Sequence, residues 1–190
     1  FIVPIYKNHY EKALVMEVVE RISRLLESSG LRLKIDNREG LTPGFKFNDW
    51  EMRGVPLRVE IGPRDVANES VGLARRDIPG RDGKSFVPQE GIGPVVEEIL
   101  AKIQLELLER ATAFRDANTH QPRDYAHFKE IVADGFAFTG WCGGEECETS
   151  IKNDTKATNR CMPFEQLKDV GLCIYCGRAA VEQVYFARAY

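Results

Sequence analysis

Two closely spaced pairs of cysteines constrain the fold of this chain more than any other feature of its sequence. Cys142 and Cys147 form a C-x4-C pair in "GWCGGEECETS", and after a further 25 residues Cys173 and Cys176 form a C-x2-C pair in "LCIYCGRAA". Glycines stand in both turns, where they allow backbone N–H groups to approach charged sulfur atoms. Each short turn thus presents a pair of sulfur atoms.

Three kinds of site contain cysteines at such spacings. A disulfide framework needs an oxidising compartment, but this chain has an odd number of cysteines and no signal-peptide pattern at its N-terminus. A thioredoxin-like redox pair places C-x-x-C at the start of a helix, whereas here Gly177 follows the second pair at once. A tetrahedral Zn(II) site with four thiolate ligands fits both turns, and we favour it.

The predicted zinc site is closed, with Cys142, Cys147, Cys173 and Cys176 as its four ligands and no open coordination position. Such a structural site stabilises the fold and performs no chemistry. The fifth cysteine, Cys161 in "NRCMPF", is left over. Because a free cysteine behaves as a small hydrophobe, we expect its side chain to be buried and not to be a fifth ligand.

Composition and net charge limit the classes of function. With 43% hydrophobic and 29% charged residues and no apolar run near the roughly 20 residues that span a bilayer, the sequence predicts a cytoplasmic protein without a membrane partner. A net charge of −3 argues against non-specific nucleic-acid binding through bulk charge. Residues 53–84 nevertheless carry seven Arg and Lys against five acidic residues, a weak local excess.

Hydrophobic periodicity predicts alternating strands and helices in the first half of the chain. Strands are expected at residues 1–6, 31–36, 56–62, 70–77 and 85–88, and helices at residues 8–29 and 42–54. The apolar positions that define the first helix are Leu14, Val18, Val19, Ile22, Leu25 and Leu26. A long helix over about residues 94–118 and a shorter one over 125–133 follow.

These elements predict an α/β fold, in which a mixed β-sheet is flanked by helices, followed by a small α+β zinc-binding domain. We place the first domain at residues 1–100, and the connecting helix with the C-terminal domain at residues 101–190. The opening "FIVPIY" reads like a strand entered partway, so we expect the chain to be a portion of a longer one.

Charged residues are densest in "GFKFNDWEMRGVPLRVEIGPRD", residues 44–65. This stretch contains Glu51 near the end of a predicted helix, and Arg58, Arg64 and Asp65 along and after the next predicted strand. A simpler interpretation exists for part of it. Arg58 and Glu60 alternate with apolar residues, so they could form the water-exposed face of a half-buried strand.

The same stretch, followed by "VGLARRD", resembles the anticodon-binding domain of the class II aminoacyl-tRNA synthetases. More narrowly, the chain resembles prolyl-tRNA synthetases of the archaeal and eukaryotic type. "IVPIYK" resembles the first strand of that domain, and both cysteine pairs, "RCMPF" and "VYFARAY" resemble the family's additional C-terminal zinc domain. Several long motifs occur in the family's order over the whole chain.

The resemblance implies that this chain binds the anticodon loop of tRNA(Pro), whose second and third anticodon positions are guanines. Family contacts fall at the positions of Glu51, Arg58, Arg64, Asp65 and, on a looser alignment, Lys84. A guanine edge offers two donors, N1–H and N2–H, and one acceptor, O6. A carboxylate accepts both donors, while Arg or Lys binds O6 or a phosphate, and unstacked loop bases are read on this edge.

The resemblance also implies what lies elsewhere in the family's enzymes. None of the class II motifs that bind ATP is recognisable here, so we expect ATP, Mg(II) and catalysis to belong to a catalytic domain of the same polypeptide, and this chain alone to be inactive. The full enzyme is expected to be a homodimer. Tyr190, with its carboxylate, is expected to reach the catalytic domain, or more simply to end an edge strand. The alternative function is a stand-alone tRNA-binding paralogue that acts as a regulator or accessory subunit.

Overall fold

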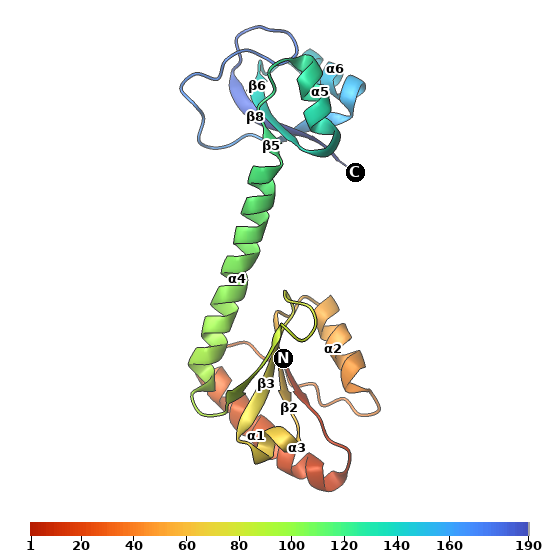
Figure 1. Cartoon of the computed structure of the whole chain (residues 1–190), viewed down its shortest axis with the longest axis vertical. Coiled ribbons are helices and arrows are strands. Elements are labelled where there is room, and N and C mark those ends of the chain that lie inside the picture. Colours follow the sequence, from red (N-terminus) through yellow and green to blue (C-terminus); the bar gives the residue numbers. More distant parts are fainter. Residues whose placement is uncertain (190) are drawn as a thin grey trace. The chain divides into compact units, whose positions relative to one another are not determined.

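The computed structural model describes residues 1–189, and the chain divides into two compact units, Phe1–Glu109 (unit 1) and Arg110–Tyr190 (unit 2) (Figure 1). The division falls inside one helix, α4 (Ile92–Ala117), and the domain limit near residue 100 that the sequence suggests lies in the same helix. Within the described residues, no helix is long and apolar enough to cross a membrane.

Unit 1 contains a four-stranded mixed sheet flanked by helices. In chain order its elements are β1 (Ile2–Pro4), α1 (His9–Ser28), α2 (Pro43–Met52), β2 (Leu57–Ile61), α3 (Pro63–Ala67), β3 (Ser70–Arg75), β4 (Lys84–Pro88) and the first part of α4. The strand order is β1-β2-β3-β4, in which β1 is parallel to β2 and the other neighbours are antiparallel. The predicted α/β fold with a mixed sheet is confirmed.

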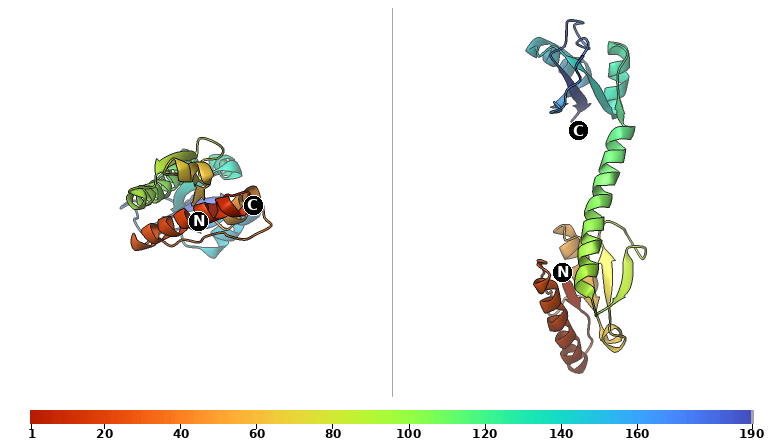
Figure 2. Two further views of the ribbon diagram at one scale, coloured as in Figure 1. Left: turned by 90° about the horizontal axis from the view of Figure 1, so that it is seen from below. Right: turned by 90° about the vertical axis from the view of Figure 1, so that its left-hand side faces the viewer.

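The core of unit 1 lies between one face of this sheet and two helices, α1 and the start of α4 (Figures 1 and 2). Val59 and Ile61 of β2 point into this core and are almost fully buried. Because side chains alternate along a strand, Arg58 and Glu60 point to the opposite face, which we call the open face. The helix α2 packs at one side of the open face. Its Trp50 ring stacks on the Phe1 ring, with the two ring centroids 5.5 Å apart.

Three predicted features of unit 1 differ in the structure. The segment 31–36 makes only an isolated bridge, between Ile35 and Ile2 of β1, which is itself a strand of three residues. The short helix α3 occupies "PRDVA", which the sequence analysis left without structure. Leu14 and Leu25 are 39% and 43% exposed, since the buried stripe of α1 runs along the neighbouring helical positions.

Unit 2 contains a second four-stranded sheet. Its elements are β5 (Thr119–His120), α5 (Tyr125–Asp134), β6 (Phe136–Trp141), α6 (Glu145–Thr155), β7 (Ala157–Cys161) and β8 (Glu182–Arg188). The strand order is β5-β6-β8-β7, with β5 parallel to β6 and β8 antiparallel to both β6 and β7. Phe128, Ile151, Val184 and Phe186 are fully buried in its core. The predicted small α+β domain is confirmed.

Tyr190 lies outside the described residues, so its expected contact with a catalytic domain stays a prediction. The simpler expectation, that it ends an edge strand, concerns the same residue and also stays a prediction. Strand β8 is internal, because it pairs with β6 on one side and with β7 on the other.

Candidate functional site

The four cysteines predicted as metal ligands lie together in unit 2. All four Sγ atoms are within 4.8 Å of one another, and the Sγ atom of Cys142 lies 3.5 Å from that of Cys147 and 3.8 Å from that of Cys176. A tetrahedron of thiolates with Zn–S bonds of about 2.3 Å has S···S edges of about 3.8 Å. The cluster therefore has the size that a tetrahedral metal site requires. The cysteines are free rather than joined by disulfides.

Two segments of unit 2 deliver these ligands. Cys142 follows β6 and Cys147 is the third residue of α6, so the first pair spans a strand-to-helix turn. Cys173 and Cys176 lie in the loop before β8, where the N–H of Gly177 donates to the carbonyl oxygen of Cys173 at 2.9 Å. Gly177 has a φ of 69°, a conformation that glycine adopts at little cost because it has no Cβ atom.

Gly140 allows the loop that carries the second pair to lie directly on β6. A Cβ atom at this position would lie 2.6 Å from the carbonyl oxygen of Leu172, 2.7 Å from that of Val170 and 2.8 Å from the Cβ atom of Ala180. The carbonyl oxygen of Gly140 also accepts a hydrogen bond of 3.1 Å from the N–H of Ile174. The loop is thus held against β6, beside the turn that carries the first pair.

The sulfur atoms of the cluster have different surroundings. Burial raises the pKa of the Cys147 thiol to about 12, whereas a hydrogen bond from the Arg178 guanidinium lowers the pKa of Cys176 to about 6. The Nε atom of Arg178 lies 3.4 Å from the Cys176 Sγ atom. A divalent cation among the four sulfur atoms would favour the thiolate at every position, because it compensates the charge that burial disfavours.

Cys161 lies outside the cluster, and the expectation that it is buried is wrong. Its side chain is exposed at the end of β7. This strand is the edge of its sheet, and the pairing with β8 shifts register between Asn159 and Cys161. An irregular edge strand leaves this side chain in solvent.

Charged side chains form a continuous chain of ion pairs on the open face of unit 1. Glu51 of α2 accepts a hydrogen bond of 2.5 Å from Arg58 Nη1, and Arg58 Nε donates to Glu60 at 2.9 Å. Glu60 also accepts a hydrogen bond of 2.5 Å from Lys84 Nζ. Three of the residues predicted as RNA contacts, Glu51, Arg58 and Lys84, are therefore joined through Glu60, which the sequence analysis did not select.

The interpretation of Arg58 and Glu60 as a water-exposed strand face is wrong. Their side chains are 14% and 8% exposed, and the Phe47 ring of α2 lies with its centroid 3.8 Å from the Arg58 guanidinium carbon. A buried ion pair depends on both of its partners, since removal of one leaves an uncompensated charge. The chain of ion pairs is thus a fixed arrangement, and it presents Glu51, whose side chain is 38% exposed, to solvent.

Arg64 and Asp65 are not part of this chain of ion pairs. They lie in α3, beyond the carboxyl end of β2. Asp65 Oδ2 accepts a hydrogen bond of 2.8 Å from the N–H of Gly62, so this carboxylate stabilises the start of α3. Arg64 is exposed, and its guanidinium has no hydrogen bond or ion pair with any of residues 1–189. The free guanidinium and the second oxygen of Asp65 are available to a ligand.

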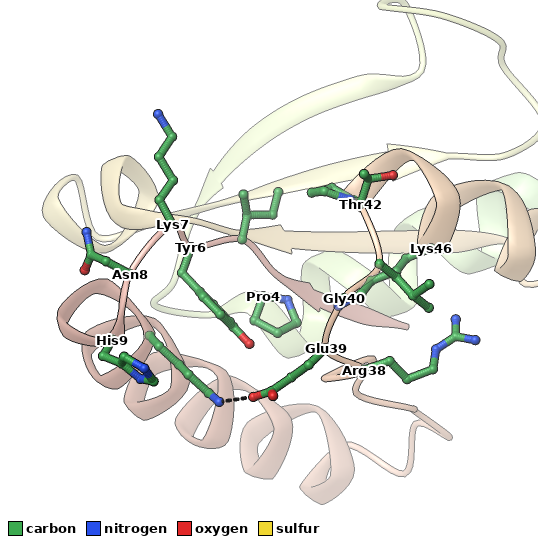
Figure 3. Close-up of a pocket in the computed structure, with 14 residues that line it drawn as sticks. Pro4, Tyr6, Lys7, Asn8, His9, Arg38, Glu39, Gly40, Thr42 and Lys46 are labelled. Atoms are coloured by element: carbon green, nitrogen blue, oxygen red, sulfur yellow. Dashed lines mark hydrogen bonds and ion pairs between the residues drawn. The ribbon is translucent and has the colours of Figure 1, made fainter.

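A separate pocket of about 490 Å³ opens in unit 1, where the end of β1 meets the start of α1 and the loop before α2 (Figure 3). In its lining Lys12 is paired with Glu39 at 2.6 Å and Arg38 with Asp36 at 2.7 Å. The Arg38 guanidinium holds the pKa of Asp36 far below its usual range. Two of the pocket's cations are thus neutralised within the protein, and none of the predicted contact residues lines it.

Local sequence signals point to the residues that the sequence analysis missed. Glu60 stands two residues after Arg58, and therefore on the same side of the strand. Phe47 precedes Glu51 by four residues, which places both on one face of α2. Arg178 follows Cys176 by two residues. For Gly140 the sequence holds no such signal, because its neighbours come from a loop that begins about thirty residues later.

Comparison with known proteins gives consistent matches for both units. The family model described as "Anticodon binding domain" matches residues 1–84, and the model described as "Prolyl-tRNA synthetase, C-terminal" matches residues 125–190. Among curated proteins, the proline–tRNA ligase of Chloroflexus aurantiacus is 50% identical over 189 residues. The chloroplastic/mitochondrial proline–tRNA ligase of Arabidopsis thaliana is 42% identical over 193 residues.

These matches cover the whole of this chain but only part of the relatives. The chain spans 39% of the length of the Chloroflexus protein and 36% of the Arabidopsis protein. A similar structure is that of prolyl-tRNA synthetase from Cryptosporidium parvum, complexed with L-proline and AMP. It superimposes with a TM-score of 0.82 at 28% identity, over 100% of this chain and 40% of that one.

Proposed function

Because the chain belongs to the prolyl-tRNA synthetase family, as its anticodon-binding and C-terminal domains, we propose that unit 1 binds the anticodon loop of tRNA(Pro). The observation that carries this proposal is the chain of ion pairs on the open face. It fixes the solvent-facing carboxylate of Glu51 next to the buried guanidinium of Arg58. Only one of the two Glu51 oxygens, Oε1, is bound by Arg58. A carboxylate held in this way is ready to accept the N1–H and N2–H donors of a guanine.

Asp65 and Arg64 supply the second set of groups in this proposal. Asp65 has one oxygen bound to the backbone of α3 and one free, and the Arg64 guanidinium beside it in sequence is free. We assign Asp65 to a second guanine edge, and Arg64 and Lys84 to O6 or phosphate oxygens. The two carboxylates belong to different elements, α2 and α3, so two adjacent bases can be read independently.

Zn(II) is the metal that we assign to the four-cysteine cluster. Four thiolates at tetrahedral spacing are the ligand set of structural zinc sites, and four protein ligands complete a tetrahedral shell. The ion would be held by Cys142, Cys147, Cys173 and Cys176 and would supply stability to unit 2 rather than chemistry. Full zinc in the purified protein by elemental analysis is the expected result.

Attachment of proline to tRNA, with ATP and Mg(II), is proposed as the activity of the whole synthetase, which the chain serves by tRNA recognition. Contact with a catalytic domain and a homodimeric enzyme are proposed with it. A relative with an organellar name occurs in Arabidopsis, so family membership alone does not fix the compartment. A cytoplasmic location is our proposal.

The test measures, by fluorescence anisotropy at one fixed salt concentration, how tightly the protein binds RNA stem-loops with the proline anticodon. Replacing Glu51 by Ala should weaken binding by about 1–3 kcal/mol, as loss of a bidentate base contact does. The loss should be much smaller for a loop in which the recognised guanine is adenine, since adenine lacks both donors. Equal losses on both loops would remove the base-reading role of Glu51.

Asp65 needs a milder substitution, because its carboxylate also stabilises α3. Removing a capping oxygen costs about 0.5–2 kcal/mol of stability, so Asp65→Ala confounds folding with binding. Asp65→Asn keeps an acceptor for the Gly62 N–H and should still lose the preference for guanine. Glu27→Ala, at an exposed position on α1 away from the open face, is the matched control and should bind like wild type.

A further inference from the structure

An exposed aromatic ring stands on the open face of unit 1, outside the residues assigned so far. Phe86 of β4 is 65% exposed, although most large apolar side chains of the strands in unit 1 are buried. Its neighbours along this face of β4 are Lys84 and Pro88, and its backbone pairs with Gly72 of β3. Single exposed apolar side chains are common on protein surfaces, so what distinguishes this ring is the set of groups that surround it.

The surroundings of Phe86 fix the ring in place. A Cβ atom at position 72 would lie 3.4 Å from the Phe86 Cε1 atom, so the ring leans over Gly72 and keeps its other face free. Lys84 Nζ lies 5.3 Å from the ring centroid, and the same ammonium group is held by Glu60. The ring therefore sits beside a cation whose position is set from within the sheet.

This arrangement repeats the one on the other side of Glu60. There the Arg58 guanidinium lies 3.8 Å from the Phe47 centroid, and Arg58 is bound by the same carboxylate. One buried acid thus anchors two pairs of a cation and an aromatic ring. Phe47, a residue of α2, is half-buried, whereas Phe86 is mostly exposed.

We propose that Phe86 is a stacking subsite for one unpaired nucleobase of the bound RNA loop, read by its flat face and not by its edge. The inference rests on the proposed function of unit 1 and extends it. Aromatic rings beside cations bind single-stranded bases in this way, because every base has a π-face and the cation attracts the adjoining phosphate. The subsite therefore takes any base, unlike the positions that Glu51 and Asp65 read.

Free positive charge in the turn that leads into β4 favours RNA over an apolar protein partner. Arg76 and Arg81, in the turn between β3 and β4, are exposed, and neither guanidinium has a hydrogen bond or ion pair with another described residue. An apolar protein surface would bury such charges at a cost, whereas a phosphate backbone pairs with them. Phe86 is also a single ring among charges rather than part of an apolar patch.

The experiment is a binding cycle between Phe86→Ala and loops that carry one abasic nucleotide at each position in turn. Phe86→Ala should weaken binding of the wild-type loop roughly 5- to 150-fold, the usual cost of removing a stacking ring. The loss should be the same for guanine and adenine loops. At one loop position, removal of the base should weaken binding by the wild-type protein but leave the affinity of Phe86→Ala unchanged.

Two further variants separate stacking from general damage to the surface. Phe86→Trp should bind at least as tightly as wild type, and its added fluorescence should be quenched when the loop binds. Tyr10→Ala removes another exposed ring, at the start of α1, and should bind like wild type.

Normal binding by Phe86→Ala, or an equal effect of every abasic position in both proteins, overturns the subsite. If Glu51→Ala still shows its dependence on guanine in that case, the proposed function stands and only this inference fails. If wild-type protein binds no anticodon loop, both fail together.

Discussion

Gly140→Ala should disturb the metal centre of unit 2 without changing any ligand. The added methyl group would lie 2.6 Å and 2.7 Å from two carbonyl oxygens and 2.8 Å from the Cβ atom of Ala180. Favourable contacts between such atoms lie near 3.5–4.0 Å, so the loop would have to retreat by about 1 Å. All three obstacles are backbone or Cβ atoms, which cannot rotate away.

The expected magnitude follows from this collision. Overpacking of a well-packed site costs about 1–3 kcal/mol. The loop that must retreat carries Cys173 and Cys176, whose sulfur atoms form half of the tetrahedron. If the strain is passed to the metal, affinity falls by roughly 5- to 150-fold, at about 1.4 kcal/mol for each factor of ten.

The assay is competition for zinc with a chromogenic chelator, together with hydrogen exchange to locate the loosened segment. Gly44→Ala, in unit 1, is the control, since a Cβ atom at this position would meet nothing within 4 Å. Exchange should rise in the loop before β8 and stay unchanged in unit 1. Zinc affinity within twofold of wild type and an unchanged unfolding temperature would refute the reasoning.

Two further predictions concern the metal ligands and the pH dependence of stability. Cys173→Ser should lose the metal and loosen unit 2, while Cys161→Ala keeps its full metal content. Elemental analysis checks both, and full zinc in Cys173→Ser would contradict the ligand set. Hydrogen bonds from Arg38 and Trp50 hold the pKa of the Asp36 carboxyl group below its usual 3.8. The ionised Asp36 therefore stabilises the fold above that pH, and its contribution is lost as the pH falls. The difference in unfolding free energy between wild type and Asp36→Asn, from denaturant titrations, should be full at pH 7 and shrink below about pH 4, whereas a constant difference would show that the ion pair is irrelevant.

Periodicity in the sequence was sufficient to predict most elements of unit 1. It failed where the partner strand, and not the segment itself, decides whether a strand forms. The alternation in residues 56–62 became β2, because its apolar side meets a helix-covered core. The equally clear alternation in residues 31–36 became a single bridge beside the three-residue strand β1. A strand needs a partner of matching length, and partner length is not a property of the segment itself.

The spacing of the cysteines likewise predicted the four-sulfur cluster, but not how unit 2 builds it. Spacing reports which residues share a turn, since a turn is a local structure. It did not predict that α6 begins within the first turn and carries Cys147. Nor did it predict the exposed side chain of Cys161, because a register shift on an edge strand depends on the pairing with β8.

By itself the sequence determined most of the side chains that face the core, which residues could hold a metal and which charged residues follow one another along a strand. Only the tertiary structure decided that Glu60 joins Arg58 to Lys84 and that Phe86 leans over Gly72. The contacts of Glu60 with Lys84 and of Phe86 with Gly72 cross between strands, and the register that creates them is set by the whole sheet rather than by any one strand. Gly140 has the same explanation, since its missing side chain matters only once a distant loop packs against β6.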